Sequence, residues 1–297
     1  MTSAIRLAAA AFLGMTAGMA MAADKVPVLL ITGHNNHNWQ YTSRVHAETL
    51  EATGRFDVTI TDDPASTLAD AAGLSAYRVF VLDYNDSQAP KRWGDAAEKN
   101  FVEAVRGGAG VVSIHSANNA FDGWADYEKM IGLLWREGTG HGKFHEFEVQ
   151  IVDGEHPIMK GVKAFTIEDE LYHALVNTQK AEYRLLAKAF STKESGGTGK
   201  DEPMAMTLEF GKGRVFHTPL GHVWPGSDGN KPSVLNPGLR TLIARGTEWA
   251  ASGEVTLPAE WKDVRTHNVL SEQEKKDGWT LLFDGEKVSG LRGYKKE

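Results

Sequence analysis

The sequence predicts an α/β protein built on a parallel, doubly wound sheet, and two observations support this class. Three short runs, residues 26–32, 78–84 and 110–116, are continuously apolar, which is typical of strands buried on both faces. Segments with apolar residues at helical spacing stand between these runs. Alternation of strand and helix along a chain indicates a parallel sheet with helices packed on its faces.

The first half of the chain is expected to alternate strands and helices. Gly54 and Gly107 follow the two helical segments and are suitable stop signals. The second strand alternates apolar and polar residues, so it is expected nearer an edge of the sheet. In chain order the expected elements are a strand at 26–32, a helix at 41–53, strands at 56–61 and 78–84, a helix at 95–106 and a strand at 110–116.

The second half is expected to consist of shorter strands separated by turns, followed by a closing helix. Gly211-Lys212-Gly213 joins the last two strands and predicts a hairpin, and residues 196–201 predict a flexible loop. The expected strands are 147–152, 183–190, 204–210 and 214–220, and the helix is 238–251, with Leu239, Leu242, Ile243 and Trp249 facing inward.

Composition and targeting signals exclude several classes of protein. The 297 residues include 41% hydrophobic and 24% charged residues, as in an ordinary globular protein, and no cysteine, which excludes a thiol nucleophile. Residues 1–22 resemble an export signal, with Arg6, a short apolar run and small residues before the cleavage point. Loss of Arg6 with no acid changes the formal charge from −7 to −8, which argues against nucleic acid as a partner. The mature protein is expected to be soluble, free of the membrane and exported, and the lack of cysteine suits a bacterial periplasm.

The histidines are the main chemical signal. Most of the eleven follow predicted strands or lie in turns. The carboxyl ends of parallel strands share one edge of the sheet, where open α/β folds bind ligands. His34 and His37 follow the first strand and His115 follows the fourth, so His34 and His115 are expected to face one crevice, which His222 can join.

A chemical role is favoured for only some histidines. His34, His115 and His222 each have a small neighbour that would let a substrate approach the backbone closely. These neighbours are Gly33, Ser116 and Gly221. A structural role is expected for His46, His145, His156 and His267.

An acidic run, residues 168–170, is the second chemical signal. Three adjacent acids in an extended segment cannot all point one way, so Asp169 or Glu170 is expected to face inward, toward Tyr172 and the crevice. A solvated acidic turn is the alternative. An inward Glu170 can orient a histidine, act as a general base or complete a metal shell.

Motifs for metals and nucleotides are weak or absent. The pairs His34/His37, His141/His145 and His217/His222 have spacings that can chelate a metal, but such spacings also arise by chance. No Walker loop and no glycine-rich dinucleotide fingerprint is present, so no nucleotide cofactor is expected. A divalent metal such as zinc or manganese remains open.

Several segments together resemble the trehalose-utilisation (ThuA-like) family. These are I-T-G-H-N-N-H-N-W, T-D-D-P-A, R-G-G-A-G-V-V-S-I-H-S-A, G-T-G-H-G-K-F, D-G-E-H-P-I-M-K-G, E-D-E-L-Y, F-G-K-G-R-V-F-H-T-P-L-G-H and G-T-E-W-A, in order across residues 26–251. The resemblance implies a flavodoxin-like three-layer α/β/α sandwich with a mostly parallel central sheet, related to the class I glutamine amidotransferases. It also implies that the catalytic cysteine of those amidotransferases has been lost in this family, in agreement with the absence of cysteine here. It carries polar site residues onto His34, His37, His115, His141, Asp169, Glu170, Tyr172 and His222.

The C-terminal tail resembles the opening of a second domain. After a linker at 252–271, residues 272–297 contain G-W-T-L-L-F-D-G-E-K-V-S-G-L-R-G-Y, which resembles the start of the 3-keto-disaccharide hydrolase domain, a jelly roll. A lone strand at 279–283 cannot bury its own apolar face, so the tail is expected either to dock on the main domain or to begin a truncated one. This context indicates glycosides or their 3-keto forms as substrates.

The leading hypothesis is an exported enzyme that hydrolyses, eliminates or isomerises a sugar derivative by histidine and carboxylate chemistry, with or without a metal. His115 and His222 are expected as acid and base, with Glu170 as orienting residue or ligand and His34 beside them. Substrate binding is expected from Asn36, His37, His141, Asp169, Tyr172 and Trp224.

A sugar-binding module without catalysis is the rival, using Trp39, Trp224 and Asn36. A tight imidazole cluster favours the enzyme, whereas scattered histidines beside a shallow aromatic shelf favour the module. An amidase is a third reading, and it would require Ser116 to replace the missing cysteine.

Overall fold

The computed structural model describes residues 25–86, 91–265, 270 and 275–282. The predicted export signal at 1–22, His267 and much of the tail lie outside these residues. No strand is present over residues 279–282, where Trp279 and Leu282 are exposed, and Phe283 lies outside the described residues.

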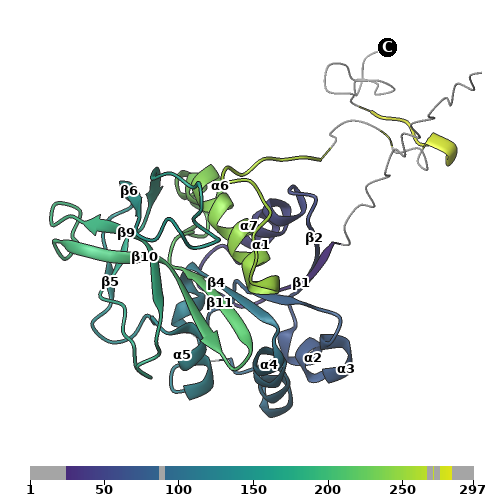
Figure 1. The fold of residues 1–297 in the computed structure, drawn as a ribbon, viewed down its shortest axis with the longest axis horizontal. Helices are drawn as coiled ribbons and strands as arrows, with labels where there is room; N and C mark the ends of the chain where they lie inside the picture. The colour runs from purple at the N-terminus through teal and green to yellow at the C-terminus, as the bar shows by residue number, and fades with distance from the viewer. Residues whose placement is uncertain (1–24, 87–90, 266–269, 271–274, 283–297) are drawn as a thin grey trace, which may run out of the picture.

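One nine-stranded mixed sheet forms the centre of the protein (Figure 1). Its order is β2-β1-β3-β4-β11-β10-β9-β6-β7, and β5 and β8 form a separate two-stranded ladder. The strands are β1 (Val26–Ile31), β2 (Phe56–Thr61), β3 (Val79–Leu82), β4 (Gly110–Ile114), β5 (Gly140–His141), β6 (His145–Ile151), β7 (Phe165–Asp169), β8 (Tyr172–His173), β9 (Arg184–Ser191), β10 (Lys200–Phe210) and β11 (Gly213–Thr218).

The sheet has a parallel and an antiparallel half. Strands β2, β1, β3, β4 and β11 are parallel neighbours, in the order found in flavodoxin-like folds. Strands β10, β9, β6 and β7 continue the sheet in antiparallel pairs. The carboxyl ends of the parallel strands therefore meet at one edge, where this fold class binds ligands.

Helices cover both faces of the parallel half (Figure 1). Along β1, Val28 and Leu30 pack in the core with α1 and α7, whereas Leu29 and Ile31 pack in the core with α2 to α5. This division explains why the strand is apolar at consecutive positions. The helices are α1 (Trp39–Glu51), α2 (Pro64–Ala69), α3 (Ala71–Leu74), α4 (Asp95–Gly107), α5 (Ala125–Ile131), α6 (Pro232–Leu235) and α7 (Pro237–Ser252), with 3₁₀ turns at His115–Asn119 and Asp228–Asn230.

The expected fold class is confirmed, including the edge position of β2 and the hairpin between β10 and β11. The predicted inward side chains of α7, from Leu239 to Trp249, are buried. Other expectations were incomplete, and the short elements α2, α3, α5, α6, β5 and β8 were not expected. The predicted loop at 196–201 already enters β10 at Lys200, and β7 was not expected because its acidic end masks its alternation of exposed and buried residues.

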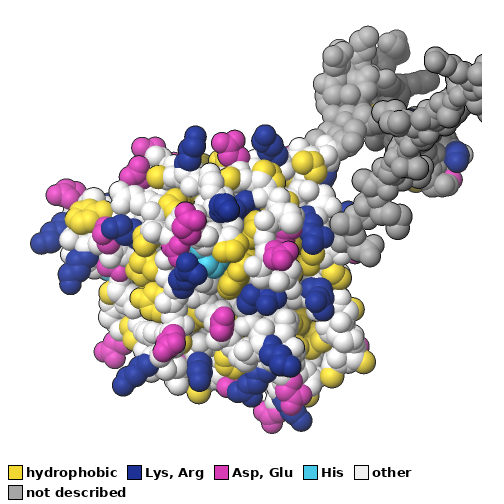
Figure 2. Space-filling model, viewed as in Figure 1, with side chains coloured by type: hydrophobic (Ala, Val, Ile, Leu, Met, Phe, Trp, Pro, Cys, Tyr) yellow, Lys and Arg dark blue, Asp and Glu magenta, His cyan; other side chains and the backbone are white. Residues whose placement is uncertain are grey.

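Surface charge and hydropathy agree with this globular form. Acidic and basic side chains are interspersed on the face shown in Figure 2. Among the described residues, no helix is both long and apolar enough to cross a membrane.

Candidate active site

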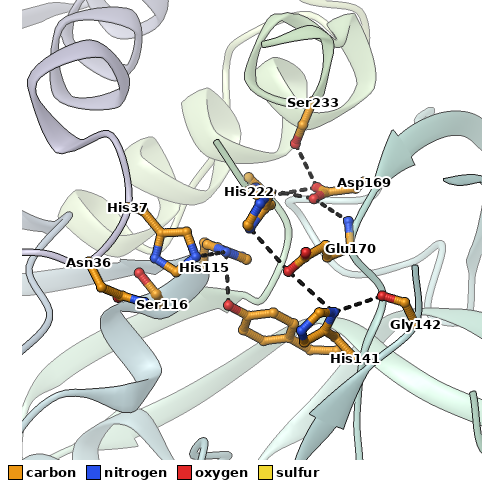
Figure 3. Close-up of polar contacts among 12 residues, drawn as sticks. Asn36, His37, His115, Ser116, His141, Gly142, Asp169, Glu170, His222 and Ser233 are labelled. Atoms are coloured by element: carbon orange, nitrogen blue, oxygen red, sulfur yellow. Dashed lines mark hydrogen bonds and ion pairs between the residues drawn. The ribbon is translucent and has the colours of Figure 1, made fainter. Parts of the chain in front are cut away.

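Three buried histidines meet at the carboxyl edge of the parallel sheet. His37 follows β1, His115 follows β4 and His222 follows β11. One nitrogen from each imidazole lies within 4.8 Å of the others, and the Nε2 atoms of His37 and His115 are 3.3 Å apart (Figure 3). The sequence reasoning that strand ends bring distant histidines together is therefore confirmed for His115 and His222.

His115 stands at a strained turn directly after β4. Its φ is +49°, a left-handed conformation that is uncommon for residues other than glycine. Its Nδ1–H donates to the carbonyl oxygen of Pro219, at 2.8 Å, and its Nε2 accepts from the Tyr172 hydroxyl, at 2.9 Å. The ring is thereby fixed from both sides.

A chain of side chains fixes His37 from behind. The Asn35 Oδ1 atom lies 3.1 Å from His37 Nδ1 and also accepts the His37 backbone N–H. The Asn35 amide reaches Asp83, which in turn accepts a hydrogen bond from Thr42 on α1 at 2.6 Å. Burial raises the pKa of Asp83 to about 7, opposed by these donors. The chain sets the orientation of the His37 ring.

Asp169, at the end of β7, organises the loop that carries His222. Its Oδ2 accepts from the Gly221 N–H and the Ser233 hydroxyl, both at 2.7 Å. Its Oδ1 accepts from the N–H groups of Glu170 and His222. Burial raises the pKa of Asp169 to about 7, and the four donors oppose this shift. Asp169 is fully buried, so it supports the site without facing the pocket.

Glu170 lies between two imidazoles. Its Oε2 is 3.1 Å from His222 Nδ1 and 3.4 Å from His141 Nδ1 (Figure 3). The short ladder of β5 and β8 pairs His141 directly with Tyr172, which explains why these residues share the site. Burial raises the pKa of Glu170, opposed by His141. A half-buried carboxyl between two nitrogen bases is suited to accept and return a proton.

The three clustered imidazoles are neutral at physiological pH. Burial, assisted by the neighbouring histidines, lowers the pKa of His37 to about 3 and that of His222 to about 4. The same causes lower the pKa of His115 well below its usual value. Burial also raises the pKa of Tyr172, so its phenol stays protonated. Each imidazole therefore keeps a nitrogen lone pair.

A pocket of about 480 Å³ opens beside this cluster. His37 and His222 reach it, whereas His115 lies behind them and does not line it. Trp224, with 45% of its surface exposed, packs its edge against His37 and lies parallel to His222. The other lining residues are Asn36, Asn119, Trp135, His141, Glu170, Tyr172, Ser227 and Asn230.

The structure separates His34 from the other candidate residues. Its Nδ1 faces the carbonyl oxygen of Asn85, at 2.7 Å, its ring lies against Tyr84, and it does not line the pocket. His37 of the same loop takes the inward position. The expectation that His34 shares the crevice with His115 is therefore wrong in the local geometry, because the loop after β1 turns only one of its two histidines inward.

The small neighbours of the histidines serve packing rather than substrate approach. Gly33 has φ +101°, and a Cβ atom there would lie 2.0 Å from the carbonyl oxygen of Asp62. Gly221 has φ +119°, a backbone conformation that residues with a Cβ atom rarely adopt. Ser116 donates its hydroxyl to Asn35, so it is turned toward the loop that holds His37, and no described contact gives it a histidine base.

Several site residues were missed by sequence reasoning. Asn35 and Asp83 position His37, and Trp135 lines the pocket against Tyr172. Asp83 follows β3 at the same sheet edge as the histidines, a signal that would have found it. Trp135 lies in an irregular segment with no such signal.

These features define a flavodoxin-like α/β protein with a pocket lined by imidazole and carboxylate groups at the carboxyl edge of its parallel strands. Residues 27–250 match the family model ThuA, described as trehalose utilisation. The match spans well over half of the chain, so the protein belongs to the ThuA family, and this supports a carbohydrate function related to trehalose utilisation.

Solved structures agree with this membership. A protein described as ThuA-like from Parabacteroides merdae is 32% identical, with a TM-score of 0.71 over 79% of this chain and 93% of its own. A ThuA-like protein from Bacteroides uniformis is 17% identical, with a TM-score of 0.57 over 82% of this chain and 98% of its own, and it supports the fold alone. Comparison with curated proteins finds no match.

Proposed function

We propose that this protein is an exported enzyme that breaks or rearranges a glycoside, in its 3-keto form, by proton transfer at the carbon next to the ketone. The observation that carries the proposal is the Glu170 carboxylate held between His222 and His141 at the wall of the pocket. Family membership supports a carbohydrate substrate, and the tail resemblance supports the 3-keto form.

The pocket has the size and lining that a sugar requires. Its volume of about 480 Å³ lies within the range of roughly 300–1,000 Å³ that is usual for small-molecule sites. Trp224 and Trp135 offer flat apolar faces, and Asn36 and Asn230 offer amide groups for hydroxyls. Tyr172, His37, His141 and His222 also line it.

The chemistry can be balanced with residues that line the pocket. Glu170 takes the proton from C2 of a 3-keto-glycoside, and the resulting enolate places its negative charge on the ketone oxygen. The Tyr172 hydroxyl, which donates to His115 Nε2 in the structure, turns to donate its hydrogen bond to that oxygen. The electron pair then expels the glycosidic oxygen from C1, and the imidazolium form of His141 donates a proton to this oxygen. Glu170 afterwards passes the proton taken from C2 to His141, 3.4 Å away, which restores both residues. The products are an unsaturated ketone and an alcohol, and later addition of water would complete hydrolysis.

This division of roles differs from the expectation that His115 and His222 are acid and base. His115 does not line the pocket, and its two nitrogens face Pro219 and Tyr172. His222 reaches the pocket but presents Nδ1 to Glu170. We therefore propose Glu170 as the base, with His222 orienting it.

A chromogenic 3-keto-glucoside tests the proposal. Its aglycone is released only if the glycosidic bond breaks, so we expect turnover by the wild type and a loss of about 100-fold or more in Glu170→Gln. The matched control is Glu168→Gln, because Glu168 lies two residues away, is exposed and does not line the pocket. If calorimetry detects binding of the sugar but no aglycone is released, the proposal of an enzyme is overturned and the sugar-binding module is favoured.

A further inference from the structure

The contacts of His37 and His115 place the Nε2 lone pairs of these two rings next to each other, and His222 lies beside them. An oxygen atom lies near Nδ1 of each ring: Asn35 Oδ1 at 3.1 Å from His37, the Pro219 carbonyl at 2.8 Å from His115, and Glu170 Oε2 at 3.1 Å from His222, where the contact is an ion-pair distance without hydrogen-bond geometry. In His37 and His115 these acceptors place the ring proton on Nδ1 and the lone pair on Nε2. Two neighbouring lone pairs, those of His37 and His115, are then only 3.3 Å apart.

We propose that His37, His115 and His222 together bind one divalent transition-metal ion of the zinc type through their Nε2 atoms. Among the described residues, they are the one group of three histidine, aspartate or glutamate side chains whose ligand atoms come this close together. The proposal rests on the proposed function only in that the ion would share the sugar pocket. A cation between the lone pairs replaces their repulsion by coordination.

The spacing and surroundings fit zinc. Tetrahedral coordination with Zn–N bonds of about 2.0–2.1 Å requires nitrogens about 3.4 Å apart, and His37 and His115 already meet this value. One nitrogen of His222 lies within 4.8 Å of a nitrogen of each of the other two rings, so His222 must move closer to complete the site. A carboxylate, an amide oxygen and a backbone carbonyl near the Nδ1 atoms are the usual outer contacts of metal-binding histidines.

The open position of the ion faces the pocket. His37 and His222 both line it, so a substrate oxygen or a water molecule can reach a fourth coordination site. Three neutral imidazoles favour zinc over manganese, which prefers oxygen ligands. The Tyr172 hydroxyl shares the His115 lone pair, so metal binding must displace this hydrogen bond.

Zinc content and cobalt absorption test the site without using turnover. Chelator-treated protein is incubated with Zn²⁺, passed through a desalting column and analysed for zinc. We expect about one equivalent in the wild type and less than a tenth in His37→Ala, His115→Ala or His222→Ala, with circular dichroism to verify folding. The control is His34→Ala, which alters the same loop outside the cluster and is expected to keep one equivalent. If an alanine variant fails to fold, the glutamine variant at that position is used.

Two further readouts separate a metal site from a structural cluster. Co²⁺ should give intense visible absorption typical of low coordination number in the wild type but not in His222→Ala. Tyr172→Phe should bind Zn²⁺ several-fold more tightly, because it removes the competing hydrogen bond at His115. Less than a tenth of an equivalent in the wild type, or normal zinc in any folded cluster variant, would overturn the site.

The zinc measurement and the cleavage of 3-keto-glycosides test the metal site and the proposed function separately. One bound zinc without cleavage of any 3-keto-glycoside would support the metal site and remove the proposed reaction. Cleavage that continues in chelator-treated protein unable to retain zinc would remove the metal site and support the reaction.

Discussion

Replacement of Asp169 should uncouple the loop that carries His222 from β7. The carboxylate accepts four hydrogen bonds, from three backbone N–H groups and the Ser233 hydroxyl, and it is fully buried. In Asp169→Ala the three backbone donors cannot rotate to new partners. An unsatisfied buried donor costs about 1–3 kcal/mol, so we expect the free energy of unfolding to fall by about 4 kcal/mol, after allowance for partial entry of water.

The isosteric Asp169→Asn variant gives the sharper comparison. Each carboxylate oxygen accepts two donors, so the amide nitrogen of asparagine must face at least one backbone N–H. We expect a loss of about 2 kcal/mol. Ser233→Ala removes one of the four bonds and should cost about 1 kcal/mol.

Urea unfolding at pH 8, above the Asp169 pKa of about 7, measures these differences with the carboxyl ionised. An unfolding free energy of Asp169→Asn within about 0.5 kcal/mol of the wild type would show instead that this position does not need an acceptor on both side-chain atoms.

Three further predictions concern pH, substrate and backbone. Burial lowers the pKa of His46 to about 3, from 6.5 for an exposed histidine. Below pH 6.5 the unfolded state therefore binds a proton that the folded state does not, and the free energy of unfolding of the wild type should fall by up to about 1.4 kcal/mol per pH unit relative to His46→Gln. Urea unfolding at pH 7.5, 6 and 5 measures this difference. Trp224→Ala should raise the KM of a 3-keto-glycoside about 3- to 10-fold in steady-state kinetics, because an aromatic contact with the sugar is lost. Thermal stability should change little, because the ring is 45% exposed. An unchanged KM would remove Trp224 from the sugar site. Gly33→Ala should destabilise the protein by about 3 kcal/mol or more, because the new Cβ atom would lie 2.0 Å from the carbonyl oxygen of Asp62. The loss is measured as a lower midpoint of thermal unfolding, and a midpoint within 1 °C of the wild type would contradict it.

The fold could be predicted from the sequence because its central strands carry a strong pattern. Strands β1, β3 and β4 are buried on both faces, and consecutive apolar residues reveal this without knowledge of their partners. The antiparallel half was predicted less completely. In β7, the sequence at Glu168 and Asp169 looks like a surface turn. Asp169 is nevertheless buried, and its carboxylate accepts four hydrogen bonds, three from distant segments and one from the neighbouring Glu170.

The site was predictable only to the level of the sheet edge. His115 and His222 were found because the carboxyl ends of parallel strands converge. The choice between His34 and His37 depends on the path of an irregular loop, which is set by tertiary contacts of Asn35 with Ser116 and Asp83. Trp135 reaches the pocket from a segment without periodicity, so no local pattern places it there.

Exchange of solvent deuterium into C2, the carbon next to the ketone, reports proton transfer by Glu170 whether or not the glycosidic bond breaks. A slowly cleaved 3-keto-glucoside in D₂O, followed by proton NMR, should lose its C2 proton signal in the presence of the wild type. Glu170→Gln should slow this exchange by about 100-fold or more, whereas Glu168→Gln should exchange at the wild-type rate. Exchange no faster than in buffer, or equally fast exchange in Glu170→Gln, would contradict the account of this pocket as a site of proton transfer on keto-sugars.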